Sequence, residues 1–172
     1  MPDAVSEARD RGIEAVQGDA CSLPSGSATT DAVLLLDVLE HVGDDARAVA
    51  EAWRVLRAGG VLVVSVPLYP RLWSRHDEEM GHLRRYRPGE ASRLLETSGF
   101  KTVYRTSWNS LGLAGAVFRK AGFGIEKAVP LAQPFLSVES WLAARVPLAM
   151  GLSEVTVGVK TGAETLVGAS IA

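Results

Sequence analysis

The fold is decided by two runs, TDAVLLLDVLEHV at residues 30–42 and RAGGVLVVSVP at residues 57–67. Short apolar runs rich in β-branched residues are typical of strands buried on both faces, as in parallel sheets. Between the runs, Val49, Trp53 and Leu56 recur at helical spacing and predict one apolar stripe that faces a sheet. The pattern therefore predicts a right-handed strand–helix–strand crossover, the centre of an α/β domain.

Capping residues set the expected ends of the helix in this unit. Asp44 or Asp45 is a good N-cap, and Gly59 is expected as the residue just past the helix C-terminus. The rest of the chain predicts further elements: an N-terminal helix ending at Gly12, a strand at 13–17, a helix from Pro88 to Gly99, a strand at 102–107, two or three short helices within 111–150, and a strand at 154–160 half exposed on one face.

Composition limits the class of protein. A chain of 172 residues with 47% hydrophobic and 22% charged residues predicts one globular domain, which we place at 1–162, followed by a flexible tail at 163–172. A net charge of −2 argues against a non-specific nucleic-acid binder. The single Cys21 excludes an internal disulfide, and no run is long enough for a signal peptide or stable membrane insertion. We therefore expect a cytoplasmic protein.

Three motifs in order carry a family resemblance: GDACSLP at 18–24, DAVLLLDVLEHV at 31–42 and RVLRAGGVL at 54–62. They resemble the class I S-adenosylmethionine-dependent methyltransferases, especially the branch that includes ubiquinone and menaquinone biosynthesis enzymes. The resemblance implies a Rossmann-like, doubly wound, mostly parallel sheet, with S-adenosylmethionine as cofactor. It also implies methyl transfer to a small-molecule acceptor, lipidic acceptors among the candidates.

The sequence also departs from this family. Ala58 and Thr30 replace a usual proline and a usual aromatic residue. More importantly, the glycine-rich first motif, its strand and the acidic ribose-binding residue are absent, so we expect an N-terminally truncated domain without the first two family strands. The strand at 32–36 would then have a free edge. One alternative is a non-catalytic fragment or interaction module that binds no cofactor alone. Another nucleotide-binding α/β enzyme, such as a nicotinamide oxidoreductase, is less favoured because no glycine fingerprint is present.

The resemblance assigns the cofactor-binding positions. Asp19 and Ala20 would contact the adenine, and the backbone of Leu36 and Asp37 would hold the methionine part. For Asp19 the alternative is a loop residue that caps its own turn.

Asp37, Glu40 and His41 follow the first run at spacings that share one helical face. Such a set can hold a divalent ion, or His41 can act as a base near the transferred methyl group. The simpler interpretation, in which Glu40 and His41 brace the following helix, is preferred. We therefore predict no metal site and keep His41 as the candidate catalytic base.

A polar, aromatic loop follows the second run, at the ligand-binding end of such a sheet. Arg84 or Arg85 can clamp a carboxylate or phosphate of the acceptor. In the alternative, internal ion pairs with Asp77, Glu78 and Glu79 tie the loop down. The substrate-binding candidates are Tyr69, His76, His82, Arg84, Arg85 and Tyr86.

Overall fold

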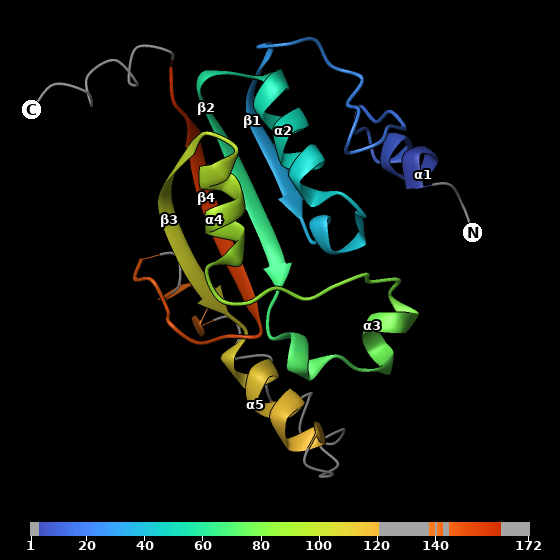
Figure 1. Ribbon diagram of the computed structural model, residues 1–172. Coiled ribbons are helices and arrows are strands. Elements are labelled where there is room, and N and C mark those ends of the chain that lie inside the picture. The colour runs from blue at the N-terminus through green and yellow to red at the C-terminus, as the bar shows by residue number, and fades with distance from the viewer. Residues whose placement is uncertain (1–3, 121–137, 140, 143–144, 163–172) are drawn as a thin grey trace, which may run out of the picture.

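The computed structural model describes residues 4–120, 138–139, 141–142 and 145–162. Its sheet has the strand order β1-β2-β4-β3 (Figure 1). The β1–β2 pair is parallel and both pairs made by β4 are antiparallel, so β1, β2 and β3 share one direction. The strands are β1 (Thr30–Leu36), β2 (Leu56–Pro67), β3 (Phe100–Trp108) and β4 (Ser153–Lys160).

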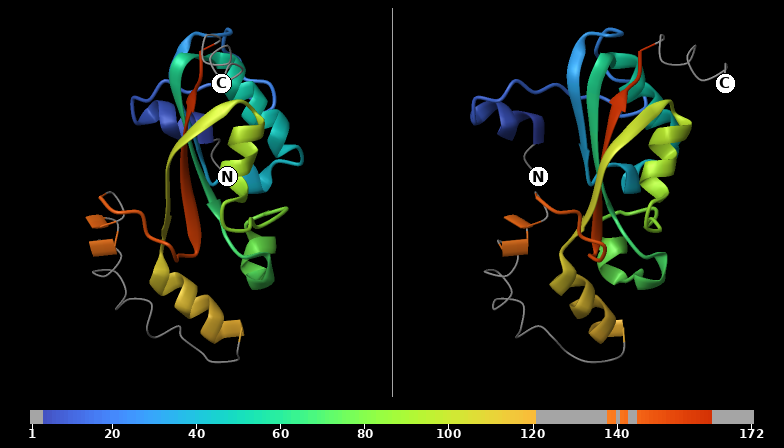
Figure 2. Two further views of the ribbon diagram at one scale, coloured as in Figure 1. Left: turned by 60° about the vertical axis from the view of Figure 1, so that its left-hand side comes forward. Right: turned by 90° about the vertical axis from the view of Figure 1, so that its left-hand side faces the viewer.

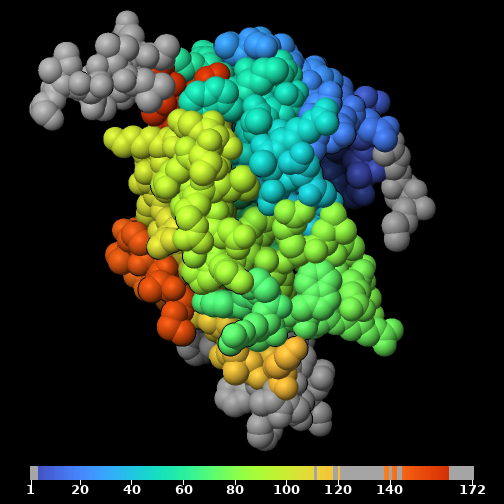
Figure 3. Space-filling model, viewed as in Figure 1, coloured from blue at the N-terminus to red at the C-terminus, as the bar shows by residue number. Residues whose placement is uncertain are grey.

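Helices lie on both sides of this sheet. The α-helices are α1 (Ala4–Asp10), α2 (Asp45–Val55), α3 (Arg75–Glu79), α4 (Glu90–Thr97) and α5 (Ser110–Lys120), and two 3-10 turns are η1 (Leu39–His41) and η2 (Pro70–Leu72). Figure 2 shows α2 and α4 on one side of the sheet and α1 on the other. In Figure 3, α2, α4 and the loop of residues 68–89 cover the face of the sheet that is turned to the viewer. The predicted Rossmann-like α/β architecture is confirmed.

The β1–α2–β2 crossover is present as predicted. Asp44 is the N-cap of α2, and its carboxylate accepts a hydrogen bond of 2.9 Å from the Arg47 amide. The buried residues of α2 are Ala48, Val49, Ala52 and Val55. Of the predicted stripe, Val49 is therefore confirmed, whereas Trp53 is only partly buried against the core and Leu56 lies beyond the helix in β2.

The predicted end of α2 at Gly59 is wrong. The helix ends at Val55, because Leu56 is extended and pairs with Thr30 of β1. The register then shifts, and Gly59 has a left-handed φ of 78° within the irregular start of β2. At Gly60 a Cβ atom would lie about 3 Å from two backbone carbonyl oxygens, so this close approach to β1 requires glycine.

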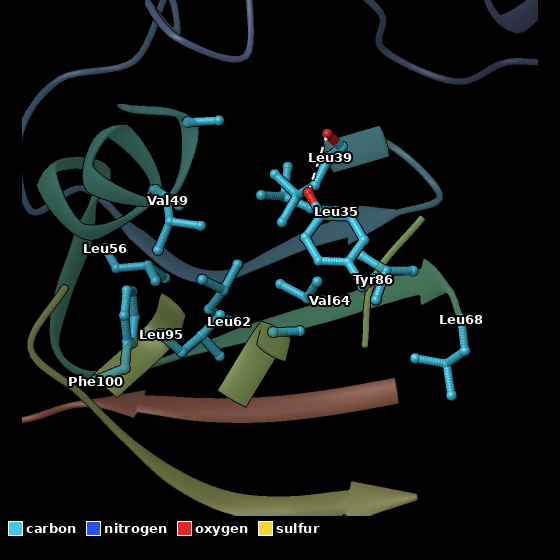
Figure 4. Close-up of a cluster of buried hydrophobic side chains, with 14 residues drawn as sticks. Leu35, Leu39, Val49, Leu56, Leu62, Val64, Leu68, Tyr86, Leu95 and Phe100 are labelled. Atoms are coloured by element: carbon cyan, nitrogen blue, oxygen red, sulfur yellow. Dashed lines mark hydrogen bonds between the residues drawn. The ribbon is translucent and has the colours of Figure 1, made fainter. Parts of the chain in front are cut away.

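One hydrophobic core lies between the sheet and the two helices α2 and α4 (Figure 4). Val49 of α2, Leu62 and Val64 of β2, and Leu95 of α4 are fully buried there. Burying a side chain of this kind stabilises the fold by roughly 1.5–3 kcal/mol. We therefore expect the covered face of β2 to be the most stable part of the sheet.

β4 presents its two faces differently. Val155, Val157 and Val159 are partly exposed, which confirms the predicted half-exposed face. On the helix side the strand buries Glu154, whose carboxylate accepts a hydrogen bond of 2.9 Å from the Gly89 amide at the start of α4. A negative charge is favourable at a helix N-terminus, so the buried carboxylate anchors α4 to the sheet.

The strand predicted at 13–17 is wrong. Residues 13–18 have no regular secondary structure, and Ile13 and Val16 are exposed. A strand forms only beside a partner, and the described residues offer none at this place. β1 is accordingly an edge strand of the described sheet, as expected, with Leu34 60% exposed.

The other predicted elements agree with the structure. Gly12 and Gly99 follow α1 and α4 with positive φ angles of 78° and 96°. The region 111–150 contains most of α5, and its remainder lies largely outside the described residues, as does the tail predicted at 163–172. None of the helices that the structure describes has the length and apolar character needed to cross a bilayer.

Candidate functional site

The site lies where β1 and β2 end, at their carboxyl edge. Asp37 follows β1 with φ 52°, and Tyr69 lies two residues after β2 with φ 62°. Left-handed backbone in residues other than glycine is strained and concentrates at functional sites. The Asp37 carboxylate accepts a 2.6 Å hydrogen bond from the Ser65 hydroxyl, which joins the two strand ends.

Arg84 and Tyr86 of the loop of residues 68–89 fix this loop to the domain through Asp45 of α2. Arg84 donates to the Asp45 carboxylate at 3.0 Å and to the Gly43 carbonyl at 2.7 Å. The Tyr86 hydroxyl is buried and donates to Asp45 at 2.8 Å. Burial, followed by the bond to Asp45, raises the pKa of Tyr86 far above its usual range, so it stays neutral. Arg84 and Tyr86 therefore hold the loop to the start of α2.

Asp77 is the centre of the loop and is fully buried. It accepts hydrogen bonds from Arg85 Nε at 2.6 Å, from His82 Nδ1 at 2.9 Å and from the Ser74 amide at 2.9 Å. Burial alone would raise the pKa of Asp77, but these three donors outweigh it and lower the pKa to about 2. The carboxylate is therefore ionised, and His82 must donate through Nδ1.

Three ligating groups meet beside this carboxylate. The rings of His41 and His82 lie edge to face with centroids 4.9 Å apart. Nδ1 of His41 lies 3.1 Å from the Gly81 carbonyl, which can only accept, so this ring also donates through Nδ1. Glu40 is 1% exposed, and its Oε2 has no hydrogen-bond partner among the described residues. Burial, with Asp37 nearby, raises the pKa of Glu40.

The structure shows how the two parts of this cluster meet. Glu40 and His41 belong to η1, directly after β1, and the Glu40 carbonyl accepts a 2.7 Å hydrogen bond from the Leu83 amide. That bond brings His82 beside η1, although 40 residues separate the two segments. The third member of the set is therefore His82, whereas the carboxylate of Asp37 is held by Ser65.

The residues assigned to the cofactor lie in a turn before β1 and at the end of β1, and Cys21 of that turn contacts the Asp44 carbonyl at the start of α2. Asp19 and Ala20 form a tight turn in which the Asp19 carboxylate accepts a 2.8 Å hydrogen bond from the Cys21 amide. Leu36, the last residue of β1, is exposed, and so is Asp37. Asp19 therefore does cap its own turn, which leaves its further acceptor capacity for a ligand.

The remaining substrate candidates separate into two groups. His76 is exposed on α3, whereas Arg85 is nearly buried and also donates to the Leu68 carbonyl at 3.1 Å. Arg85 thus makes one of the internal ion pairs considered above, with Asp77, whereas Arg84 pairs with Asp45, a partner that the sequence did not indicate.

A pocket of about 510 Å³ opens between η2 and α5. Tyr69 contributes to it, and most of its other lining side chains are apolar. The lining residues are Tyr69, Arg71, Leu72, Ser110, Leu113, Ala114, Val117 and Met150. The sequence indicated an apolar stretch here but not a pocket, because the facing segments are about 40 residues apart.

Comparisons with known proteins point to methyltransferases. The sequence model of the family described as a methyltransferase domain matches residues 1–64. A probable S-adenosylmethionine-dependent methyltransferase of Mycolicibacterium smegmatis is 34% identical over 120 residues, which is 68% of this chain and 47% of that protein. The chloroplastic 2-methyl-6-phytyl-1,4-hydroquinone methyltransferase 2 of Oryza sativa subsp. japonica is 34% identical over 76 residues, 42% of this chain and 22% of that protein. The chain thus spans less than half the length of either relative.

A solved structure shows the same fold. The S-adenosylmethionine-dependent methyltransferase from Thermotoga maritima superposes with a TM-score of 0.60 at 19% identity, covering 91% of this chain and 69% of that one. At this identity the likeness concerns the fold alone. The family match, the relatives and the fold thus agree that the chain is similar to the class I S-adenosylmethionine-dependent methyltransferases, whose cofactor is S-adenosylmethionine.

Proposed function

We propose that this chain supplies the acceptor side of a methyltransferase active site and that the acceptor carries a large apolar group. The observation that carries the proposal is the apolar pocket between η2 and α5, at the same sheet edge as His41 and His82. Its volume of about 510 Å³ suits a small molecule. Tyr69 lines this pocket, and its amide bonds to the Tyr86 carbonyl of the loop that carries His82.

Asp19, in the turn before β1, and Leu36 and Asp37, at the end of β1, offer groups that can bind the cofactor. Asp19 can accept from an adenine amino group while it holds the Cys21 amide, since a carboxylate has several acceptor positions. Leu36 and Asp37 offer exposed backbone at the strand end, with Asp37 in the left-handed region. When bound, S-adenosylmethionine supplies an electrophilic methyl group on a positively charged sulfur.

The two imidazoles supply the acid–base chemistry. Both rings donate through Nδ1, so the Nε2 atom of each carries a lone pair. With S-adenosylmethionine bound, the sulfur would keep the electron pair of the broken sulfur–methyl bond, and Nε2 of His41 or His82 would accept the proton of the acceptor hydroxyl. Asp77 holds the His82 ring in place and stabilises its protonated form. The protein mainly positions the reactants, and the histidines remove the proton.

A hydroquinone or related phenol with a long apolar chain is the acceptor class that we favour. The rice relative is named for such a compound, with a phytyl chain on a hydroquinone ring. The apolar chain of the acceptor would lie in the apolar pocket, and its phenolic hydroxyl or a ring carbon would face His41 and His82.

The test is methyl transfer from S-adenosyl-L-[methyl-³H]methionine to hydroquinones with short and long alkyl chains. Val117→Trp should fill the pocket and raise KM at least tenfold for long-chain acceptors but little for short ones. Val103→Trp, at an exposed position of β3 outside the pocket lining, is the matched control. Equal effects of both variants, or no transfer to any phenol, would contradict the proposal.

A second candidate is a methyltransferase-like module that does not bind cofactor alone. The observation that supports this second candidate is that the 172 residues contain no glycine-rich cofactor turn of the kind described above. Each lost charge-assisted hydrogen bond costs roughly 1.5–3 kcal/mol, so affinity would fall tenfold to a hundredfold or more. Titration calorimetry of this chain with S-adenosylmethionine distinguishes the two, since low-micromolar binding is incompatible with the module.

A further inference from the structure

We propose that Glu40, His41 and His82 form a binding site for a divalent transition-metal ion. One carboxylate oxygen and one nitrogen of each ring lie within 4.8 Å of one another. The set combines two imidazoles with one carboxylate, a ligand combination found for zinc and for non-haem iron.

The surroundings orient both rings as metal ligands. His82 donates its Nδ1–H to the Asp77 carboxylate, and His41 donates its Nδ1–H to the Gly81 carbonyl. Histidine ligands of metals almost always make such a bond with their other ring nitrogen, which fixes the tautomer and increases the basicity of the ligand. In both rings the Nε2 lone pair is therefore available to an ion.

The Glu40 carboxylate gives independent support. Its Oε2 is buried and lacks a hydrogen-bond partner within the described part of the chain. Buried polar oxygens are nearly always paired, because an unpaired one loses its hydration without compensation. A cation bound beside the two imidazoles supplies that missing partner.

Binding requires only a small closure. Bonds of about 2.0–2.2 Å place two ligands of a tetrahedral ion roughly 3.4 Å apart. Ligand atoms that lie up to 4.8 Å apart must therefore approach one another by at most about 1.4 Å. His41 is the exposed member of the set, so we expect its ring to make this adjustment while it keeps its bond to the Gly81 carbonyl. The Glu40 carbonyl is bonded to Leu83, and His82 is bonded to the buried Asp77.

The ligand chemistry selects the kind of ion. Magnesium and calcium prefer oxygen ligands, whereas imidazole suits zinc, iron, cobalt and related ions. Three protein ligands leave at least one position open for water or another oxygen. A bound ion occupies the Nε2 lone pairs that the proposed function assigns to proton removal. If methyl transfer to a hydroxyl is the function, the acceptor oxygen would then occupy the open position, where the ion makes its proton easier to lose to water. The binding of the ion itself does not depend on that function.

The first experiment titrates tag-free, chelator-treated protein with Co²⁺ and follows the visible absorption bands of the bound ion. Calorimetry with Zn²⁺ gives the stoichiometry, and a Cys21→Ser background removes the one thiol. We expect one ion per chain. Glu40→Gln and His41→Ala should each weaken binding at least tenfold. His76→Ala, which removes the other histidine of the same loop, should leave the metal affinity unchanged.

Two further results complete the test. Asp77→Asn should weaken binding about 10–100-fold through loss of the His82 orientation, without removing a ligand. His41→Ala decides the matter even if Glu40→Gln fails to fold, because His41 is exposed. The proposal is overturned if the parent protein binds no ion, or if His41→Ala binds as tightly as His76→Ala. Metal binding without methyl transfer would contradict only the proposed function, and transfer without metal binding only the metal site.

Discussion

The carboxylate of Asp77, fully buried, lies 2.9 Å from Nδ1 of His82. The same oxygen accepts from Arg85 at 2.6 Å, and the other oxygen accepts from the Ser74 amide. One buried anion thus holds three parts of the loop at once. Because its partners are fixed by charge as well as by geometry, the ring of His82 has a defined orientation toward η1.

Asp77→Ala should therefore destabilise the protein well beyond the loss of one contact. Arg85 is nearly buried, so the change leaves a charge without its partner, and breaking such a pair costs about 3–5 kcal/mol. Urea unfolding measures the difference. Glu78→Ala, at an exposed site one residue away, should change stability by about 0.5 kcal/mol or less. Equal losses in the two variants would show that Asp77 is not the centre of the loop.

Acid should weaken the same interaction in a defined pH range. The folded-state pKa of Asp77 is lowered from 3.8 to about 2, so its stabilisation is complete above the ordinary value and is lost as the pH falls from about 4 toward 2. The shift corresponds to about 2 kcal/mol. Unfolding of chelator-treated protein at several pH values, compared with Asp77→Asn, isolates this contribution. A difference between the two proteins that stays constant over this range would contradict the assignment.

The sequence predicts the parts of the fold that depend on local pattern. The two apolar runs and the helix between them are recognisable because burial on both faces and the helical stripe leave marks at short spacing. Gly59, a good helix terminator, predicts too late an end for α2, because Leu56 is already extended and pairs with Thr30 of β1. The strand predicted at 13–17 is absent because a strand depends on a neighbouring strand as well as on its own residues.

The candidate site depends on long-range contacts that the sequence does not encode locally. Helical spacing groups Glu40 and His41 with Asp37, a set for which the sequence analysis predicts no metal site. The left-handed turn at Asp37 and its bond to Ser65 remove it from that face. His82 arrives through the return of a loop, held by the Leu83 amide on the Glu40 carbonyl, and no spacing rule predicts that contact.

Lys160 should contribute to stability through the C-terminus of α2. Its ammonium donates to the carbonyls of Trp53 and Leu56, both at 2.7 Å, where a positive charge is favoured by the helix dipole. Lys160→Met keeps most of the aliphatic side chain and should cost about 1–2 kcal/mol. Lys101→Met on neighbouring β3, where the lysine is exposed, is the control and should have little effect. Thermal and urea unfolding would refute the prediction if both variants matched the parent protein.

The free edge of β1 should govern the solubility of this chain. Leu34 is 60% exposed on a strand that has a partner on one side only within the described sheet, and apolar edge strands of this kind pair with other chains. Leu34→Lys places a charge on that edge and should slow aggregation, measured by light scattering at constant protein concentration, while the urea midpoint changes little. Leu35→Lys is the matched control, because Leu35 points into the core and the same charge there should unfold the domain. If Leu34→Lys aggregates as fast as the parent while remaining folded, the association surface lies elsewhere on the molecule.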